Sequence, residues 1–155
     1  MAAIPMPPSM ATSLRRHTHD GPRLFVRRCD VRRDLDIVRY ILMTAESAEV
    51  GVDETTLCSG RYDINQIAFH VELLRDYGLV EAEVSYDGFG EEPLGVTVSR
   101  LTWDGYDYLD AIRSAKVWGR AKDAISKAVG ETSLSVVKQT CTIVASELIK
   151  KQLGI

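Results

Sequence analysis

The spacing of apolar residues predicts a first helix over residues 31–46. Its apolar positions recur at intervals of three, four and three, which gives the helix one buried face: Leu35, Val38, Leu42 and Ala45. Asp34 and Asp36 fall in the first turn, where the helix dipole favours acidic side chains. This segment therefore has both the period and the charge order of an amphipathic helix.

A brief strand and a short helix are predicted before residue 60. Val50 and Val52 stand two residues apart, the period of a strand. Asp53 is a suitable N-cap for a short helix from Glu54 to Cys58. These two elements would connect the first long helix to the next.

Residues 63–77 have the clearest helical pattern in the chain. Asp63 is a good N-cap, and Gln66 stands three residues later, which is the spacing of a capping box. Gly78 suits the position just after a helix, because glycine tolerates a left-handed backbone. The buried stripe of this helix is predicted from five apolar positions: Ile64, Ile67, Ala68, Val71 and Leu74.

A β-hairpin is predicted after that helix. Residues 79–85 alternate between apolar and polar side chains, and a second alternating run follows at Val96, Val98 and Leu101. The segment between the two runs, 86–95, contains an Asp-Gly pair, further glycines and a proline, which are typical of loops.

Three more helices are predicted in the last third of the chain. Thr102 can cap the first, from Trp103 to about Ser114, and Gly105 allows a close approach to the core. Its inner face is predicted to contain Tyr106, Leu109 and Ile112. The second helix spans about 117–129 and stops at Gly130.

The last helix is predicted to begin at Thr132 or Ser133. Its apolar residues step by three, four, three and four, which is a heptad seam over two repeats: Leu134, Val137, Cys141, Val144 and Leu148. This seam can pack back on the domain or pair with a second chain, and the sequence leaves both open.

The order of these elements predicts an α+β fold, mainly α, with a winged helix-turn-helix core and two additional C-terminal helices. Three helices followed by a two-stranded hairpin are the plan of a winged helix, in which the third helix and the hairpin, or wing, make the usual contacts. We expect three parts: a disordered basic leader over 1–30, a winged-helix domain over 31–114, and a helical, oligomer-forming segment over 115–155.

Charge is strongly segregated along the chain. Residues 1–33 hold seven arginines and two acids, for a net charge of +5, and residues 113–155 hold eight basic and three acidic residues, also +5. Residues 34–112 hold four arginines against seventeen acids, for a net charge of −13. A segment this acidic repels phosphate, whereas its flanks attract it.

Residues that would indicate an enzyme or a metal site are sparse. Cys29, Cys58 and Cys141 are widely spaced, which predicts neither a disulfide framework nor a zinc site. His70 has no histidine or cysteine at helical spacing and is expected to be a partly buried or surface side chain. The chain has no phosphate-binding glycine loop and no nucleophile elbow, so we expect no enzymatic activity, cofactor or metal.

The helix over 63–77 offers candidates for reading DNA bases, on its outward positions: Asn65, Gln66, Phe69 and Arg75. A candidate phosphate-binding arm lies around the start of the first helix: Arg27, Arg28, Arg32 and Arg33. The helix over 63–77 and the wing are rich in acidic residues, however. DNA-binding proteins gain much of their affinity from phosphate contacts, which these acids would repel. The acidic wing therefore favours a protein partner, and a DNA-binding regulator is the alternative.

Residues 101–109 resemble the leucine-threonine-x-x-glycine-x-x-aromatic-leucine passage that follows the wing in many winged-helix proteins. The chain also resembles an uncharacterised bacterial and prophage family, domain-of-unknown-function family twenty-five-thirteen, over about residues 31–154. The motifs that carry this resemblance are Arg32-Arg-Asp-Leu-Asp-Ile-Val-Arg39, Ile67-Ala-Phe-His-Val71, Leu101-Thr-Trp-Asp-Gly105, Leu109-Asp-Ala-Ile-Arg113 and Val117-Trp118. The resemblance implies the fold and a bacterial or phage origin, and it supplies no catalytic residues.

We therefore expect a non-enzymatic winged-helix protein that binds a protein partner through its acidic wing and self-associates through its C-terminal helices. No run approaches the ~18 apolar residues needed to span a membrane, and residues 1–12 do not form an export signal. A cytoplasmic location is the expectation that follows.

Overall fold

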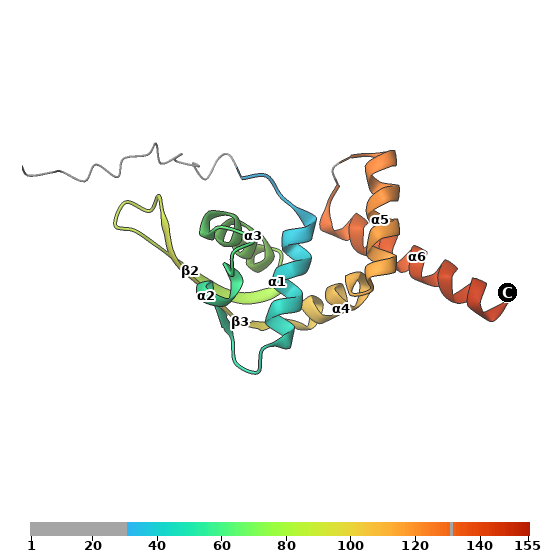
Figure 1. The fold of residues 1–155 in the computed structure, drawn as a ribbon, viewed down its shortest axis with the longest axis horizontal. Coiled ribbons are helices and arrows are strands. Elements are labelled where there is room, and N and C mark those ends of the chain that lie inside the picture. Colours follow the sequence, from blue (N-terminus) through green and yellow to red (C-terminus); the bar gives the residue numbers. More distant parts are fainter. Residues whose placement is uncertain (1–30, 131) are drawn as a thin grey trace, which may run out of the picture.

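The computed structural model describes residues 31–130 and 132–155 of the chain. Within them the fold is α+β with helix predominating (Figure 1). The elements, in chain order, are α1 (Leu35–Ser47), β1 (Val52–Asp53), α2 (Glu54–Leu57), α3 (Ile64–Asp76), β2 (Val80–Tyr86), β3 (Pro93–Leu101), α4 (Trp103–Ile112), α5 (Ala115–Ala128) and α6 (Leu134–Leu153).

The predicted hairpin is confirmed, and it forms part of a three-stranded antiparallel sheet. The strand order is β1-β3-β2, so the short β1 pairs with β3 on the side away from β2. Side chains of β2 alternate: Val80 is buried, whereas Glu81 and Glu83 are exposed. On β3, Val96 and Val98 are buried. The sheet thus presents its apolar side to the helices and its acidic side chains outward.

The first and third helices begin where local chemistry can cap them. The carboxylate of Asp34 accepts a hydrogen bond from the backbone N–H of Asp36 at 2.8 Å, so Asp34 is the N-cap of α1 and α1 starts four residues later than predicted. The capping box of α3 is present in full: Gln66 N–H donates to Asp63 at 2.9 Å, and the Gln66 side chain accepts from Asp63 N–H at 3.2 Å. Gly78 follows α3 with a φ of +85°.

The orientation of α4 differs from the sequence prediction. The sequence predicts Tyr106 on the inner face, but this side chain is 45% exposed, whereas Tyr108 is only 2% exposed. Gly105 is also buried, and a Cβ at this position would lie 2.0 Å from the carbonyl oxygen of Leu79. Because this glycine must face the turn between α3 and β2, the core side of α4 consists of Gly105, Tyr108, Leu109 and Ile112.

Polar contacts hold α5 against α1. The indole Nε1 of Trp118 donates to the carboxylate of Asp36 at 2.9 Å, and the ammonium of Lys122 lies 2.5 Å from the same carboxylate. Arg39 of α1 donates to the backbone carbonyls of Ile112 and Arg113 at 2.9 and 2.7 Å, which satisfies the end of α4. One hydrophobic cluster also extends from α1 to α6. It includes residues on both sides of position 115, where the helical C-terminal segment was expected to begin.

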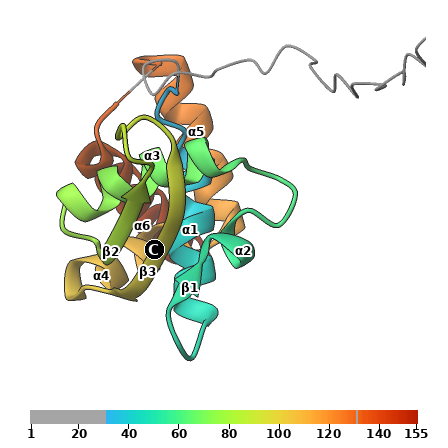
Figure 2. The ribbon, with the colours of Figure 1, turned by 90° about the vertical axis from the view of Figure 1, so that its left-hand side faces the viewer.

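The hairpin and the end of α6 lie at opposite ends of the molecule (Figure 1). Viewed from the hairpin end, β2 and β3 lie in front, with β1 and α2 to their side (Figure 2). The wing loop and the last turns of α6 are thus well separated, so they form two independent surfaces.

Candidate interaction surfaces

The four candidate base-reading residues of α3 do not form one surface. The side-chain oxygen and backbone N–H of Gln66 are both used in the capping box. Arg75 stands nine residues after Gln66, which is half a turn out of phase, so the two lie on opposite flanks of α3. Phe69 is half-buried and packs edge-to-face on His70, with ring centroids 5.2 Å apart.

The stripe of α3 that contains Asn65 and Phe69 is acidic rather than basic. At helical spacing it continues to Glu72 and Asp76. The carboxylate of Asp76 also lies 3.6 Å from the guanidinium of Arg75. A helix face with this composition repels a phosphate backbone, so the structure gives α3 little of the chemistry that base reading needs.

The structure describes only two residues of the predicted phosphate arm, Arg32 and Arg33. Arg27 and Arg28 lie outside the described residues. The guanidinium of Arg33 donates to the backbone carbonyl of Thr132, and this contact joins the segment before α1 to the loop between α5 and α6. Arg32 and Arg33 both line a cavity of about 640 Å³ at this junction.

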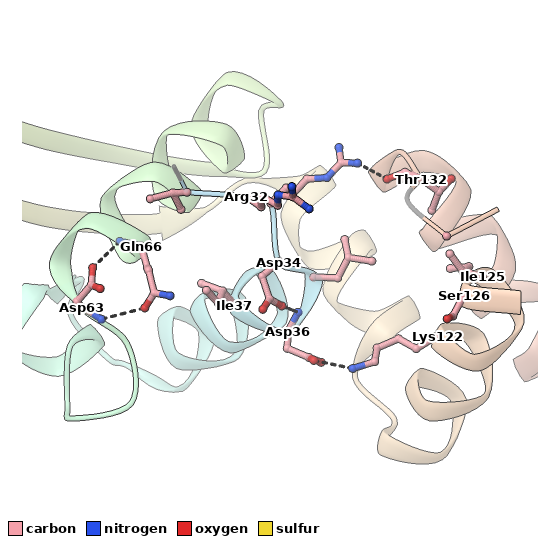
Figure 3. Close-up of a pocket in the computed structure, with 14 residues that line it drawn as sticks. Arg32, Asp34, Asp36, Ile37, Asp63, Gln66, Lys122, Ile125, Ser126 and Thr132 are labelled. Carbon is pink, nitrogen blue, oxygen red and sulfur yellow. Dashed lines mark hydrogen bonds and ion pairs between the residues drawn. The ribbon is translucent and has the colours of Figure 1, made fainter. Parts of the chain in front are cut away.

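That cavity lies where the N-terminal ends of α1 and α3 face α5 and the loop after it (Figure 3). Both helix ends are already satisfied by their own carboxylates, those of Asp34 and Asp63. Figure 3 shows Asp36 reaching Lys122 across the gap between α1 and α5. The burial of Asp36 raises the pKa of its carboxyl, but hydrogen bonds from Lys122 and Trp118 outweigh it and hold the pKa below its usual value. Among the charges that line the cavity, Asp34 and Asp63 thus cap their own helices, whereas Asp36 and Lys122 join α1 to α5.

His70 is wholly buried, which is more than the partial burial expected from the sequence. Its Nε2 accepts the backbone N–H of Asp34 at 2.7 Å, so its Nδ1 carries the proton that it donates to the Gln66 carbonyl, also at 2.7 Å. Burial lowers the pKa of His70 and keeps the ring neutral. Both ring nitrogens therefore tie α3 to the start of α1. Among residues 31–130 and 132–155, no group of three or more His, Cys, Asp or Glu is placed to hold a metal ion.

The loop of the hairpin has one aromatic residue with acidic residues before and after it in the sequence. The carboxylate of Asp87 accepts the N–H groups of Glu91 and Glu92 at 2.8 and 3.3 Å, and Asp87 N–H donates to the Glu92 carbonyl at 2.9 Å. These loop N–H groups, that of Glu91 first, lower the pKa of Asp87. Phe89 at the tip is 91% exposed. We call Asp87, Phe89, Glu91 and Glu92 the wing tip.

The acids of the wing are only partly neutralised by the rest of the hairpin. Arg100 on β3 forms a two-point contact with Glu81 on β2, with Nε 2.7 Å from one carboxylate oxygen. Glu83 is exposed on the same face of β2. The hairpin therefore presents a net negative surface that begins at Glu83 and ends at the wing tip.

A second exposed surface on α4 was missed by the sequence prediction. Trp103 is 82% exposed and Tyr106 is 45% exposed, and the two are one helical turn apart. Asp104 and Asp107 are exposed beside them. We call these four residues the α4 aromatic face. The spacing of Tyr108, Leu109 and Ile112 also fits a helical core stripe, and choosing that stripe would have placed Tyr106 outside.

The predicted oligomer seam of α6 is largely used within the chain. Leu134 is 5% exposed and Val137 and Cys141 are fully buried, and α6 packs on α4 and α5. Val144 and Leu148 are partly buried against the same core. The seam as predicted is therefore not a free surface, because its first half already has an intramolecular partner.

Comparisons with known proteins identify the family to which the chain belongs. Residues 32–131 match the family described as "Hypothetical protein (DUF2513)". An uncharacterised protein of Haemophilus influenzae is 30% identical over 121 residues, which cover 77% of this chain and 99% of the relative. The chain belongs to the family of domain of unknown function 2513. No solved structure matches it. Within the described residues, none of the helices is both long and apolar enough to cross a bilayer.

Proposed function

We propose that this chain is a non-enzymatic winged-helix protein that binds a basic protein partner through its wing. The order of elements supports the winged-helix assignment: three helices precede the hairpin, and β1, between the first two, pairs with β3. The fold alone does not decide the ligand, so the chemistry of the exposed surfaces must.

The wing tip is the observation that carries the proposal. Phe89 offers an aromatic anchor that is almost fully exposed, and the acids Asp87, Glu91 and Glu92 belong to the same loop. Interfaces commonly combine one buried aromatic side chain with a polar or charged rim. The partner that fits this surface has an apolar pocket bordered by lysine or arginine. A basic DNA-binding surface has this charge, and the wing would compete with DNA for it.

DNA is the alternative ligand, because winged-helix proteins often place α3 in the major groove. Three observations disfavour it here: Gln66 is used in a cap, Arg75 faces away from Gln66, and Glu72 and Asp76 share the outer stripe of α3. A phosphate backbone would meet acidic side chains both on this helix and on the wing.

The proposal is tested by affinity capture from a lysate of the organism that carries the gene. Three immobilised proteins are compared: the wild-type chain, a wing variant with Phe89→Ser and Glu91→Lys, and a control variant with Lys127→Glu at an exposed position of α5. We expect a stoichiometric basic protein on the wild type and the control but not on the wing variant. Equal capture by the wing variant would contradict the proposal, and so would recovery of DNA in place of a protein.

A further inference from the structure

The C-terminal part of α6 extends beyond the core and exposes apolar side chains. After Cys141 no residue of α6 is fully buried. Figure 1 shows this part of the helix projecting past α5 at one end of the molecule. We call residues 142–155 the α6 tail. Its exposed apolar residues are Ile143 at 60%, Ile149 at 58%, Leu153 at 68% and Ile155 at 85%.

Two of these residues, Ile149 and Leu153, form a short stripe with Ala145, whereas Ile143 lies about 120° away around the helix and Ile155 follows its end. Ala145, Ile149 and Leu153 are four residues apart, so they lie one above the other along the helix, next to the half-buried Leu148. Single exposed apolar residues are normal, whereas a continuous stripe marks a contact surface. Lys150 lies beside this stripe, whereas Lys151, two residues from both Ile149 and Leu153, lies on the opposite side of the helix. A partner of this stripe is therefore apolar, with an acidic border that faces Lys150.

The α4 aromatic face has the complementary composition. Trp103 and Tyr106 supply exposed aromatic surface, and Tyr77, 51% exposed, lies nearby because the hydroxyl of Thr102 donates to the Gly78 carbonyl at 2.6 Å. In the part of the chain that the structure describes, neither Asp104 nor Asp107 forms an ion pair. These two carboxylates are thus available to the ammonium groups of an incoming helix.

The α6 tail cannot reach the α4 aromatic face of its own chain. α6 is one uninterrupted helix from Leu134 to Leu153, and its buried first half fixes its direction. The tail therefore points away from the start of α4, which lies next to β3 (Figure 1). A contact between the two surfaces requires a second copy.

We propose that two copies of this chain associate by placing the α6 tail of each on the α4 aromatic face of the other. Ile149 and Leu153 would pack on Trp103 and Tyr106, and Lys150 would face Asp104 and Asp107. A two-fold arrangement of this kind closes on itself and makes the contact twice. It leaves the wing tip free, so it is independent of the partner-binding role proposed above.

Charge reversal tests this dimer. One variant, with Lys150→Glu and Lys151→Glu, has an acidic tail, and a second, with Asp104→Lys and Asp107→Lys, has a basic α4 face. All four positions are exposed, and thermal melts followed by circular dichroism check that both variants are folded. The molar mass is measured by sedimentation velocity at low salt, where charge contacts are least screened.

We expect a wild-type dimer and two variants whose dimer dissociation constants are higher by about tenfold or more, which is about 1.4 kcal/mol or more. An equimolar mixture of the two variants should dimerise again, because a tail of one variant and an α4 face of the other then carry opposite charges. The emission of Trp103 should shift to shorter wavelength on association, while Trp118, 6% exposed, is already covered.

A wild-type chain that stays monomeric would overturn the proposal. Variants that dimerise as tightly as the wild type would also overturn it, as would a mixture of variants that stays monomeric. An unchanged Trp103 spectrum in a dimer would show that a different surface is used. A failed capture of a basic partner by the wing would leave all these results unaffected, so the two proposals are distinguishable.

Discussion

Replacing Gly105 with alanine tests the packing of α4 against the turn between α3 and β2. In an exposed helix interior, alanine is more favourable than glycine by about 1 kcal/mol. At Gly105, however, the new Cβ would lie 2.0 Å from the carbonyl oxygen of Leu79 and 3.1 Å from its carbonyl carbon. Both atoms are backbone, so the clash cannot be relieved by rotating a side chain.

The size of the effect follows from what must move. Separating the Cβ from Leu79 displaces a carbonyl that also accepts the N–H of Thr102 at 3.0 Å. Overpacking a core contact costs about 1–3 kcal/mol, and loss of that hydrogen bond about 1 kcal/mol. After the gain of about 1 kcal/mol in helix propensity, we expect Gly105→Ala to lower the free energy of unfolding by about 1–3 kcal/mol.

Gly119 provides a matched control within the same protein. It lies in α5 and is exposed, and a Cβ added at this position would have no atom within 4 Å apart from those of its own helix. Gly119→Ala should therefore raise the free energy of unfolding by up to about 1 kcal/mol. The assay is urea unfolding followed by circular dichroism at neutral pH. A Gly105→Ala protein as stable as the wild type would refute the described contact between α4 and Leu79.

Three further predictions concern buried or partly buried polar groups. Burial lowers the pKa of His70 in the folded chain, so the unfolded chain binds more protons at a pH below its own pKa of about 6.5. The free energy of unfolding should therefore be constant above that pH and fall by at most about 1.4 kcal/mol per pH unit below it. Urea titrations between pH 7.5 and 5.5 measure this slope, which should be absent for His70→Gln. The Tyr108 hydroxyl is buried without a hydrogen-bond partner among the described residues, so Tyr108→Phe should leave the melting temperature equal or higher, and a loss of more than about 1 kcal/mol would reveal a partner for it. Asp36→Ala removes contacts to both Trp118 and Lys122 and should lower the free energy of unfolding by about 1–2 kcal/mol. Lys122→Met removes only one half-exposed ion pair and should lower it by less than about 1 kcal/mol. Equal losses for the two variants would contradict the role given to the Trp118 hydrogen bond.

Local chemistry made much of the secondary structure predictable. The caps at Asp63 and Thr102 and the glycine after α3 were correct because each depends only on residues within one turn. The alternating strands were also recognisable, because one side of the sheet is covered and the other is not.

Features that depend on contacts distant in sequence were not predictable in the same way. Two overlapping apolar patterns run along α4, and only the close approach of Gly105 to Leu79 decides that Tyr108 is inside. The heptad pattern of α6 did not determine what the helix packs on, and in the structure it packs on α4 and α5. The full burial of His70 depends on the start of α1, which lies 36 residues away in the sequence.

The candidate sites were likewise predictable in part from the sequence. Charge segregation identified the wing as acidic, and the structure adds that Phe89 is exposed at its centre. The four candidate base-reading residues of α3 do not share one surface, because the Gln66 side chain is used in the capping box and Arg75 lies on the opposite flank. Both facts follow from sequence spacing, so the capping box and the helical period could have separated these residues in advance. The α4 aromatic face was hidden by the same ambiguity that misplaced Tyr106.

In the function proposed above, the acidic hairpin keeps this protein from binding DNA. The most direct test is a fluorescence anisotropy titration of labelled random duplex DNA at low salt, with the wild-type chain and with a Glu91→Lys, Glu92→Lys variant. Our account predicts no saturable binding by the wild type and a gain of salt-sensitive binding by the variant. Tight wild-type binding that weakens steeply with added salt would contradict it.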